Sequence, residues 1–143
     1  MQSVVKTITL HTKQDMEIIN ITDIVKDTVA ATGIQNGTVH IMTKHTTSGI
    51  TVNEGLPDIE DDLVDMLQRL IPRNGEYRHA RFLHSDGQMA VNGYSHLRSA
   101  LVGKDTLFPL HEGEMVMGSR QTIYFMEMDG PLYREFLVHV LGV

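Results

Sequence analysis

The sequence contains no cysteine among its 143 residues. This absence excludes disulfides, zinc fingers, iron–sulfur clusters and thiolate catalysis, and it suits a reducing compartment. No block of lysine or arginine occurs, and a formal net charge of −6 argues against nucleic-acid or anionic-membrane partners. No apolar run approaches the roughly 20 residues of a membrane-spanning helix, and the first residues lack the basic and apolar parts of a signal peptide. We therefore expect a soluble cytoplasmic protein.

The length and the 41% apolar content predict one globular domain over residues 1–143. Residues 4–10 and 16–20 have strand patterns and are expected to pair as a hairpin. Further strands are predicted at residues 38–44, 49–53, 107–110, 115–118, 121–126 and 136–141.

Three helices are expected between these strands. The first begins at Thr22, which can cap it, and ends at Gly33. The second, amphipathic helix begins at Pro57 and is stopped by Pro72. Ser95 can cap a third, short helix. This mixture predicts an α+β domain built on antiparallel sheet.

Three of the eight histidines have neighbours that favour a functional site. His45 follows a predicted strand, His84 lies in the irregular stretch 74–93, and His96 falls in the first turn of the third helix. Neutral imidazoles of such dispersed origin commonly bind a divalent metal or transfer protons. No local metal-binding motif supports them, so chance proximity among many histidines remains an alternative.

Hydroxyl and amide groups near these histidines are suited to binding an oxyanion. Thr46, Thr47 and Ser48 follow His45, and Gly49 allows a close backbone approach; a polar turn between strands is the alternative. The stretch Gly118-Ser119-Arg120-Gln121 combines a guanidinium with a hydroxyl and an amide, which together can bind phosphate. A surface hairpin turn is equally compatible with it.

Carboxylates complete the set of candidates. Glu54 ends an extended segment and could be a general base, a metal ligand or the partner of a cation, or a simple loop carboxylate. The acidic residues that open the second helix are expected there from the helix dipole and favour a solvated face. They are Asp58, Glu60, Asp61, Asp62 and Asp65.

Four segments in this order resemble the YjbQ-like family, also described as secondary thiamine-phosphate synthase enzymes. They are the segment from His45 to Glu54 with the acidic helix after it, the region of His84, the segment 95–103, and the segment from Gly118 to Glu127. The resemblance covers nearly the whole chain. The family's usual Gly-Thr-Trp-Gln stands here as Gly118-Ser-Arg-Gln121, with a cation in place of an indole.

The resemblance implies a β-sandwich or barrel-like core and a homotrimer. It also implies a histidine-rich pocket that holds a divalent metal ion, zinc or magnesium, on His45, His84 and His96. Glu54 and Asp62 would assist, with His45 also acting in catalysis, and Thr47, Ser119, Arg120 and Gln121 would bind a small phosphorylated substrate. The implied reaction joins a pyrimidine pyrophosphate to a thiazole phosphate.

Two other functions are compatible with the same residues. A metal held by three histidines with an open position activates water, so a hydrolase of a small phosphorylated or carbonyl substrate is one alternative. A non-catalytic trimer that binds a small ligand or a metal is the other. The reaction products and the metal content distinguish them.

Overall fold

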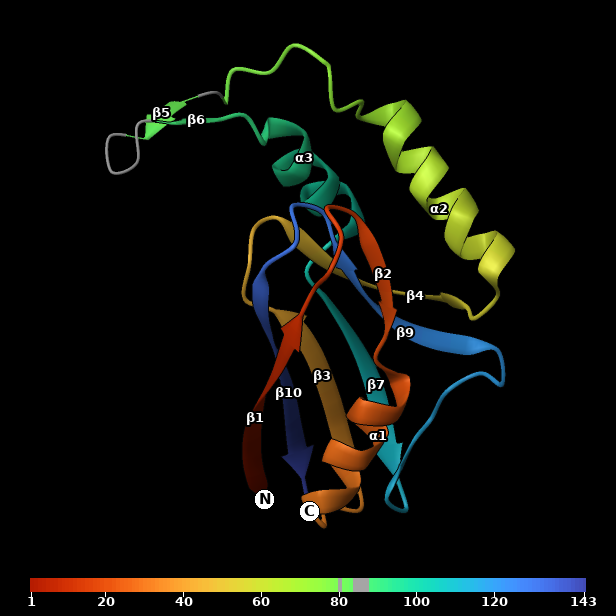
Figure 1. Ribbon diagram of the computed structural model, residues 1–143. Helices are drawn as coiled ribbons and strands as arrows, with labels where there is room; N and C mark the ends of the chain where they lie inside the picture. The colour runs from red at the N-terminus through yellow and green to blue at the C-terminus, as the bar shows by residue number, and fades with distance from the viewer. Residues whose placement is uncertain (80, 84–87) are drawn as a thin grey trace.

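The strands form two stacked antiparallel sheets and a small ribbon in the computed structural model, which describes residues 1–79, 81–83 and 88–143 (Figure 1). The five-stranded sheet has the order β1–β10–β3–β7–β8, the three-stranded sheet the order β2–β9–β4, and β5 pairs with β6. The strands are β1 Gln2–His11, β2 Glu17–Asn20, β3 Gly37–Thr43, β4 Ser48–Glu54, β5 Arg81–Leu83, β6 Gln88–Ala90, β7 Asp105–His111, β8 Glu114–Met115, β9 Gln121–Glu127 and β10 Tyr133–Gly142.

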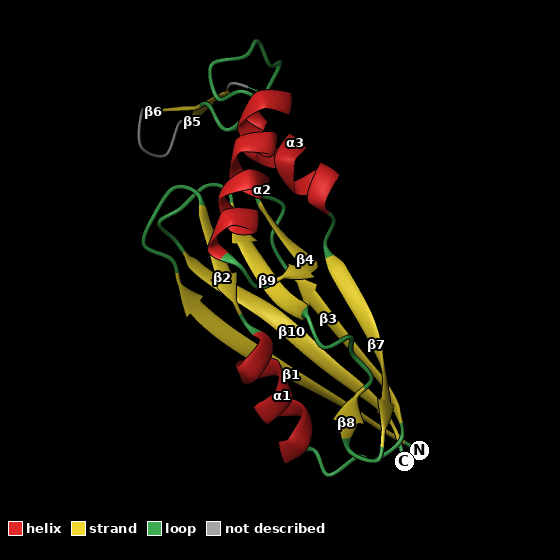
Figure 2. Ribbon diagram, turned by 90° about the vertical axis from the view of Figure 1, so that its right-hand side faces the viewer, coloured by secondary structure: helices red, strands yellow, loops and turns green. Residues whose placement is uncertain are grey.

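The main core lies between the inner faces of the two sheets and is completed by α1 (Thr22–Ala31). Alternating residues of β10 and β3 point into it, because successive side chains of a strand face opposite sides of a sheet. Phe125 of β9 packs on Phe136 of β10, with a centroid separation of 6.1 Å. Figure 2 shows α1 beside the lower half of the five-stranded sheet, where the shorter sheet does not reach.

The other two helices cover the outer face of the three-stranded sheet (Figures 1 and 2). In α2 (Pro57–Leu70), Leu67 is fully buried in a second cluster with Tyr124, Met126 and Met128. In α3 (Gly93–Val102), Val102 packs on this cluster and the helix contacts β4. The expected α+β class with a sandwich-like core is therefore confirmed. None of the helices in the described ranges is long and apolar enough to cross a membrane.

Three local expectations are wrong. Of the strand predicted at residues 115–118, only Met115 lies in a strand, the two-residue β8. The hairpin predicted between residues 4–10 and 16–20 does not form, because β1 pairs with β10 and β2 with β9, in different sheets. The side chains expected to cap two helices bind elsewhere: Thr22 Oγ1 accepts a hydrogen bond from Ile123 N–H, and Ser95 Oγ donates one to Met128 O. The Thr22 hydroxyl therefore links α1 to β9, and the Ser95 hydroxyl links its helix to the residue that follows β9. Neither hydroxyl caps its helix.

The chain crosses from one sheet to the other three times at the same end of the sandwich. These crossings are residues 12–16 between β1 and β2, residues 44–47 between β3 and β4, and residues 128–132 between β9 and β10. They lie beneath α3 in Figure 1. His45 belongs to the second crossing, so this end of the sandwich determines where its ring lies.

Candidate active site

The His45 ring is held in one orientation by the backbone of β10. Its Nε2 accepts a hydrogen bond from Glu135 N–H, at 2.9 Å. A nitrogen that accepts carries no hydrogen, so the neutral ring carries its hydrogen on Nδ1. Burial, followed by the charge of Arg134, lowers the pKa of His45 below 6.5. At neutral pH His45 is therefore an uncharged ring whose Nδ1–H is able to donate a hydrogen bond.

A buried ion pair fixes the crossing in which His45 lies. Arg134 and Glu127 are 3% and 0% exposed, and Arg134 Nε donates to Glu127 Oε2 at 2.7 Å. Thr12 Oγ1 and two backbone N–H groups also donate to this carboxylate. Burial tends to raise the pKa of Glu127, but its hydrogen bonds, above all those from Arg134, outweigh burial and lower it. Glu127 is therefore ionised and fully hydrogen-bonded.

The hydroxyl stretch after His45 is used largely inside the protein. Thr47 is buried, and its hydroxyl and carbonyl oxygens both accept hydrogen bonds from Arg134 Nη2, at 2.7 and 3.1 Å. Ser48 Oγ lies 2.7 Å from the Thr43 hydroxyl. A side chain at Gly49 would come within 2.7 Å of Val102 Cγ1, so this glycine allows α3 to approach β4. Thr46 alone of these residues has an exposed side chain.

His45 and His96 line one open depression of about 530 Å³ between this crossing and α3. Lys44 and Lys104 line it as well. Lys44 forms a 3.4 Å ion pair with Glu135, in which both side chains are partly exposed. Two imidazoles and two ammonium groups therefore surround one hollow, an arrangement suited to an anionic ligand.

The imidazole that contacts His96 is that of His79. The two ring centroids are 4.7 Å apart and the rings meet edge to face. His84, the third predicted ligand, lies outside the described residues. Neither sequence periodicity nor a local motif distinguishes His79, and only the proximity of residues 79 and 96 in the fold reveals it.

The described residues do not by themselves fit a metal ion. No group of three histidine, aspartate or glutamate side chains in residues 1–79, 81–83 and 88–143 could hold one. His45 Nε2 is occupied by Glu135 N–H, and its Nδ1 carries the hydrogen, so neither nitrogen offers a lone pair in this arrangement. The predicted zinc or magnesium ion stays a prediction.

Glu54 and the predicted phosphate-binding residues meet at the opposite end of β4. Arg120 Nη1 donates to Glu54 Oε1 at 2.8 Å, and both line an open depression of about 470 Å³ with Ser119 and Gln121. Gln121 closes its own turn, because its Oε1 accepts from Gly118 N–H. The seven residues of β4 separate this end from His45 by roughly 20 Å. One chain does not bring the two groups of predicted residues into one site.

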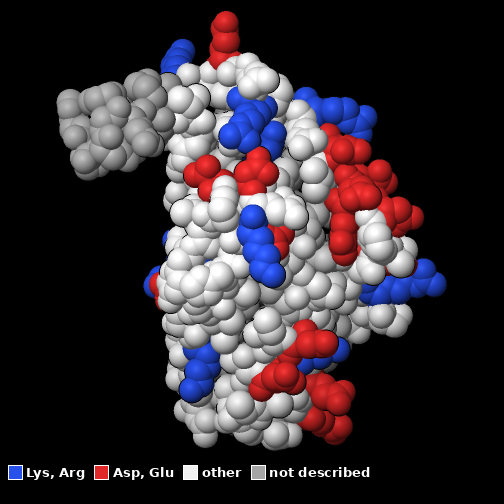
Figure 3. All heavy atoms as spheres, in the orientation of Figure 1, with Lys and Arg blue, Asp and Glu red and all other residues white. Residues whose placement is uncertain are grey.

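Asp62 lies apart from both ends, on the solvent side of α2. Acidic side chains form a patch over this helix (Figure 3), and Asp62 is exposed. Among the described residues it makes neither a hydrogen bond nor an ion pair through its carboxylate. Its predicted catalytic role stays a prediction, without support from a contact to His45 or Glu54.

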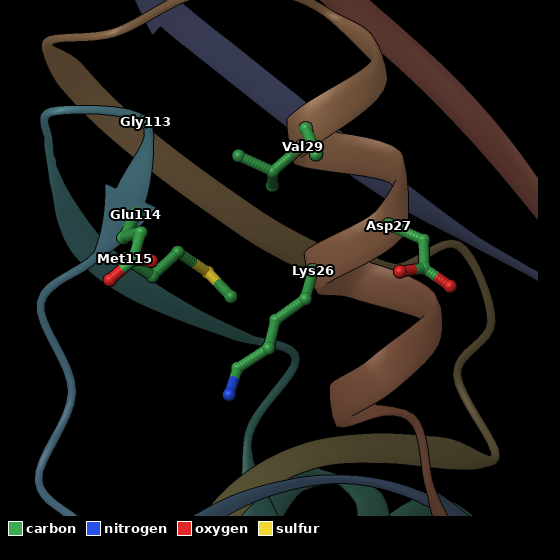
Figure 4. A pocket seen from close by; sticks show the side chains of 7 residues that line it. Lys26, Asp27, Val29, Gly113, Glu114 and Met115 are labelled. Atoms are coloured by element: carbon green, nitrogen blue, oxygen red, sulfur yellow. The ribbon is translucent and has the colours of Figure 1, made fainter.

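A third hollow, of about 360 Å³, lies between α1 and β8 and contains none of the predicted residues. Figure 4 shows Lys26 and Met115 extending toward this space from its two walls, while Asp27 points away. It has no imidazole and one cationic side chain. Its lining is therefore less suited to catalysis than that of the depression at His45.

The chain belongs to the family described as UPF0047 protein YjbQ-like, which matches residues 6–143. A UPF0047 protein of Methanothermobacter thermautotrophicus is 34% identical over 133 residues, covering 93% of this chain and 88% of that protein. The UPF0047 protein YugU of Bacillus subtilis is 33% identical over 138 residues, covering 96% and 98%.

Solved structures share the fold. A YbjQ-like protein of unknown function from Sulfolobus solfataricus matches with a TM-score of 0.90 and 28% identity, over 99% of each chain. A YjbQ/UPF0047 family protein from Clostridium acetobutylicum matches with a TM-score of 0.83 and 32% identity, over 95% of this chain and 99% of that one. The resemblance stated from the sequence is confirmed at the level of family and fold.

Proposed function

We propose that this protein is an enzyme that binds a small phosphorylated substrate in the depression between His45 and His96. The observation that carries the proposal is the lining of this depression by two imidazoles and two lysines. Ammonium groups bind phosphate through charge-assisted hydrogen bonds, and a volume of about 530 Å³ is within the usual range for small-molecule sites.

The reaction we propose is the coupling of a pyrimidine pyrophosphate with a thiazole phosphate. The thiazole nitrogen attacks the methylene carbon of the pyrimidine, the carbon–oxygen bond breaks, and pyrophosphate leaves with the electron pair. The negative charge of the leaving group increases as that bond breaks. Lys44 and Lys104 would stabilise this charge, and His45 would donate a hydrogen bond from Nδ1 to a leaving-group oxygen.

This assignment differs from the sequence prediction in its phosphate ligands. Ser119, Arg120 and Gln121 were predicted for that role, but Arg120 is paired with Glu54 at the other end of β4. Lys44 and Lys104 lie beside the histidines instead. No step of the proposed reaction uses a metal ion. His79 and His96, whose rings are in contact, are candidates to donate a proton to an oxygen of the departing pyrophosphate.

We also propose that the protein is a homotrimer, as the family resemblance implies. The outer face of the five-stranded sheet supports self-association, because the register aligns Val5, His139, His40 and Leu107 in one row across it. Val5 and Leu107 are 57% and 60% exposed. The solvated face of an antiparallel sheet is ordinarily polar, so exposed apolar side chains there favour contact with another copy. A Leu107→Lys variant would reduce the mass measured by sedimentation.

A coupling assay tests the proposed function. Purified protein is incubated with the pyrimidine pyrophosphate and the thiazole phosphate, with and without magnesium, and the products are measured by chromatography with mass detection. His96→Ala and Lys104→Met are expected to lower the rate of product formation by about 100-fold. His111→Ala is the matched control, because this exposed histidine lies at the far end of β7.

Each outcome separates the candidate functions. Equal rates for His96→Ala and the wild type would contradict the proposed site. Release of inorganic phosphate without a coupled product would favour the hydrolase. Binding of both compounds without any product would favour a non-catalytic binding protein.

A further inference from the structure

A cavity of about 270 Å³ lies on the other side of α3 from the depression at His45. His96 and Arg98 are two positions apart on this helix, about 200° around its axis, so they face opposite sides. The lining comes from the end of β9, α2, the stretch after it, the stretch before β2, and α3. The residues of this lining that concern the charge balance are Asp15, Met16, Arg73, Tyr94 and Arg98.

Arg98 is a buried cation in the wall of this cavity. It is 4% exposed, its Nε donates to Ile71 O at 3.0 Å, and its Nη1 donates to Met16 Sδ at 3.5 Å. A carbonyl is a neutral acceptor and a thioether a weak one. Within the part of the chain that the structure describes, no carboxylate forms an ion pair with Arg98. Arginine is rarely buried without an anionic partner, since an unpaired charge loses its hydration without compensation.

The electrostatics of Arg98 agree with this contact pattern. Burial is the largest influence on the guanidinium of Arg98 and lowers its pKa below the ordinary value, while Asp15 is the weakest of the influences that oppose this shift. The Tyr94 ring lies 4.9 Å from the guanidinium carbon of Arg98 and covers it without neutralising it.

The cavity opens to solvent beside a second guanidinium. Arg73 lies 5.3 Å from the Tyr94 ring centroid, and its Nη1 donates to Asp15 Oδ2 at 2.7 Å. Both side chains of this pair are more than half exposed. The two arginines and the one aspartate leave the cavity with an excess of one positive charge, which is located on the buried Arg98.

We propose that this cavity is a binding site for a small oxyanion, a carboxylate or a phosphate group, held by Arg98 and Arg73. Arg98 has five N–H donors, of which two are used by the protein, so the others are available to ligand oxygens. An anion there supplies the charge that the described protein groups do not. The site is separate from the depression at His45 and does not depend on the reaction proposed there.

Thermal unfolding in different salts tests this site. The Tm of the wild type is measured against increasing sodium phosphate and, separately, sodium acetate, with sodium chloride at matched ionic strength as the reference. A saturable rise in Tm beyond that in chloride is expected for at least one oxyanion. The anion that gives the larger rise identifies the ligand as a phosphate or a carboxylate.

Three variants locate the binding. Arg98→Met is expected to weaken binding at least tenfold, and Arg98→Lys to weaken it less because the charge remains. Arg69→Met, an exposed arginine of α2, is the matched control and should respond like the wild type. Lys104→Met should keep the part of the rise that depends on Arg98, because that lysine lines the depression at His45 instead.

A spectrum of the wild type keeps the test decisive if Arg98→Met does not fold. The Nε–H resonance of Arg98 is followed by NMR during the same titrations and is expected to shift with the same saturation as the Tm. Three results would overturn the proposal. The rise in Tm could be equally large in chloride, it could persist undiminished in Arg98→Lys, or the Arg98 resonance could stay unmoved during the titration.

Discussion

Two arginine–glutamate pairs stand at opposite ends of β9, and they differ in burial rather than in contact distance. Arg134 Nε donates to Glu127 Oε2 at 2.7 Å, and these two residues are 3% and 0% exposed. Arg120 Nη1 lies 2.8 Å from Glu54 Oε1, and these two side chains are 82% and 33% exposed. The buried pair links three crossings of the chain and holds the segment that carries His45. The exposed pair links the surface turn at Arg120 to the end of β4. We therefore expect the buried pair to be required for the fold and the exposed pair to be replaceable.

The largest effect is expected from Arg134→Met. This change leaves Glu127 ionised and buried without its partner, and breaking such a pair costs about 3–5 kcal/mol. The free energy of unfolding, measured with urea, should fall by that amount. A loss below about 1 kcal/mol would show that the two pairs are energetically alike.

The buried pair also predicts how stability depends on pH. The pKa of Glu127 is lowered in the folded protein, so its contribution is fully present above the ordinary value of 4.5 and is lost as the pH falls through the folded value. The difference in unfolding free energy between the wild type and Glu127→Gln should therefore be largest at neutral pH. It should shrink as the pH falls below 4.5. A difference that does not change over this range would be inconsistent with an ionised Glu127.

A smaller effect is expected at Tyr124, which joins β9 to α2 by donating to Glu60 Oε2 at 2.8 Å. Burial, then the hydrogen bond to Glu60 and its negative charge, raise the pKa of Tyr124 from 10.0 to about 12. Because the folded value is raised, this tyrosine stabilises the fold below pH 10 and loses that contribution as the pH rises toward 12. Difference absorbance titration of the wild type against Tyr124→Phe should show tyrosinate forming near pH 12, and a difference that is complete by pH 10 would contradict it.

The smallest effect is expected from Arg120→Met. An exposed ion pair contributes about 0–1 kcal/mol, because water screens it and the side chains lose freedom on pairing. Urea unfolding at low and at high salt should give nearly the same free energies for this variant and the wild type. A loss of unfolding free energy as large as that of Arg134→Met would mean that the exposed ion pair contributes as much to stability as the buried one.

The three helices and most of the strands could be predicted from the sequence, because their signals are local. The short strands β5 and β6 could not, since they lie in a stretch without periodicity. The alternation in residues 4–10 shows which side chains face the core, but not which strand pairs with β1. Its partner is β10, more than a hundred residues away, so the predicted hairpin was wrong.

The candidate site was only partly predictable for the same reason. His45 and His96 were found from their local surroundings and do line one depression. Lys44 and Lys104 carry no local signal, and His79 stands in a stretch without periodicity. Glu54 and Arg120 were also expected beside His45, but the length of a strand separates them, and sequence order alone does not reveal that distance.

An NMR titration with inorganic pyrophosphate tests most directly which end of β4 is the functional site. Backbone resonances of the wild type are followed as the pyrophosphate concentration increases, at constant ionic strength. The expected shifts fall on residues 44–46, 96–100 and 103–104 around the depression, and they should be lost in Lys104→Met. Shifts confined to residues 118–121, beside Arg120, would place phosphate binding at the exposed end and contradict the assignment to His45 and His96.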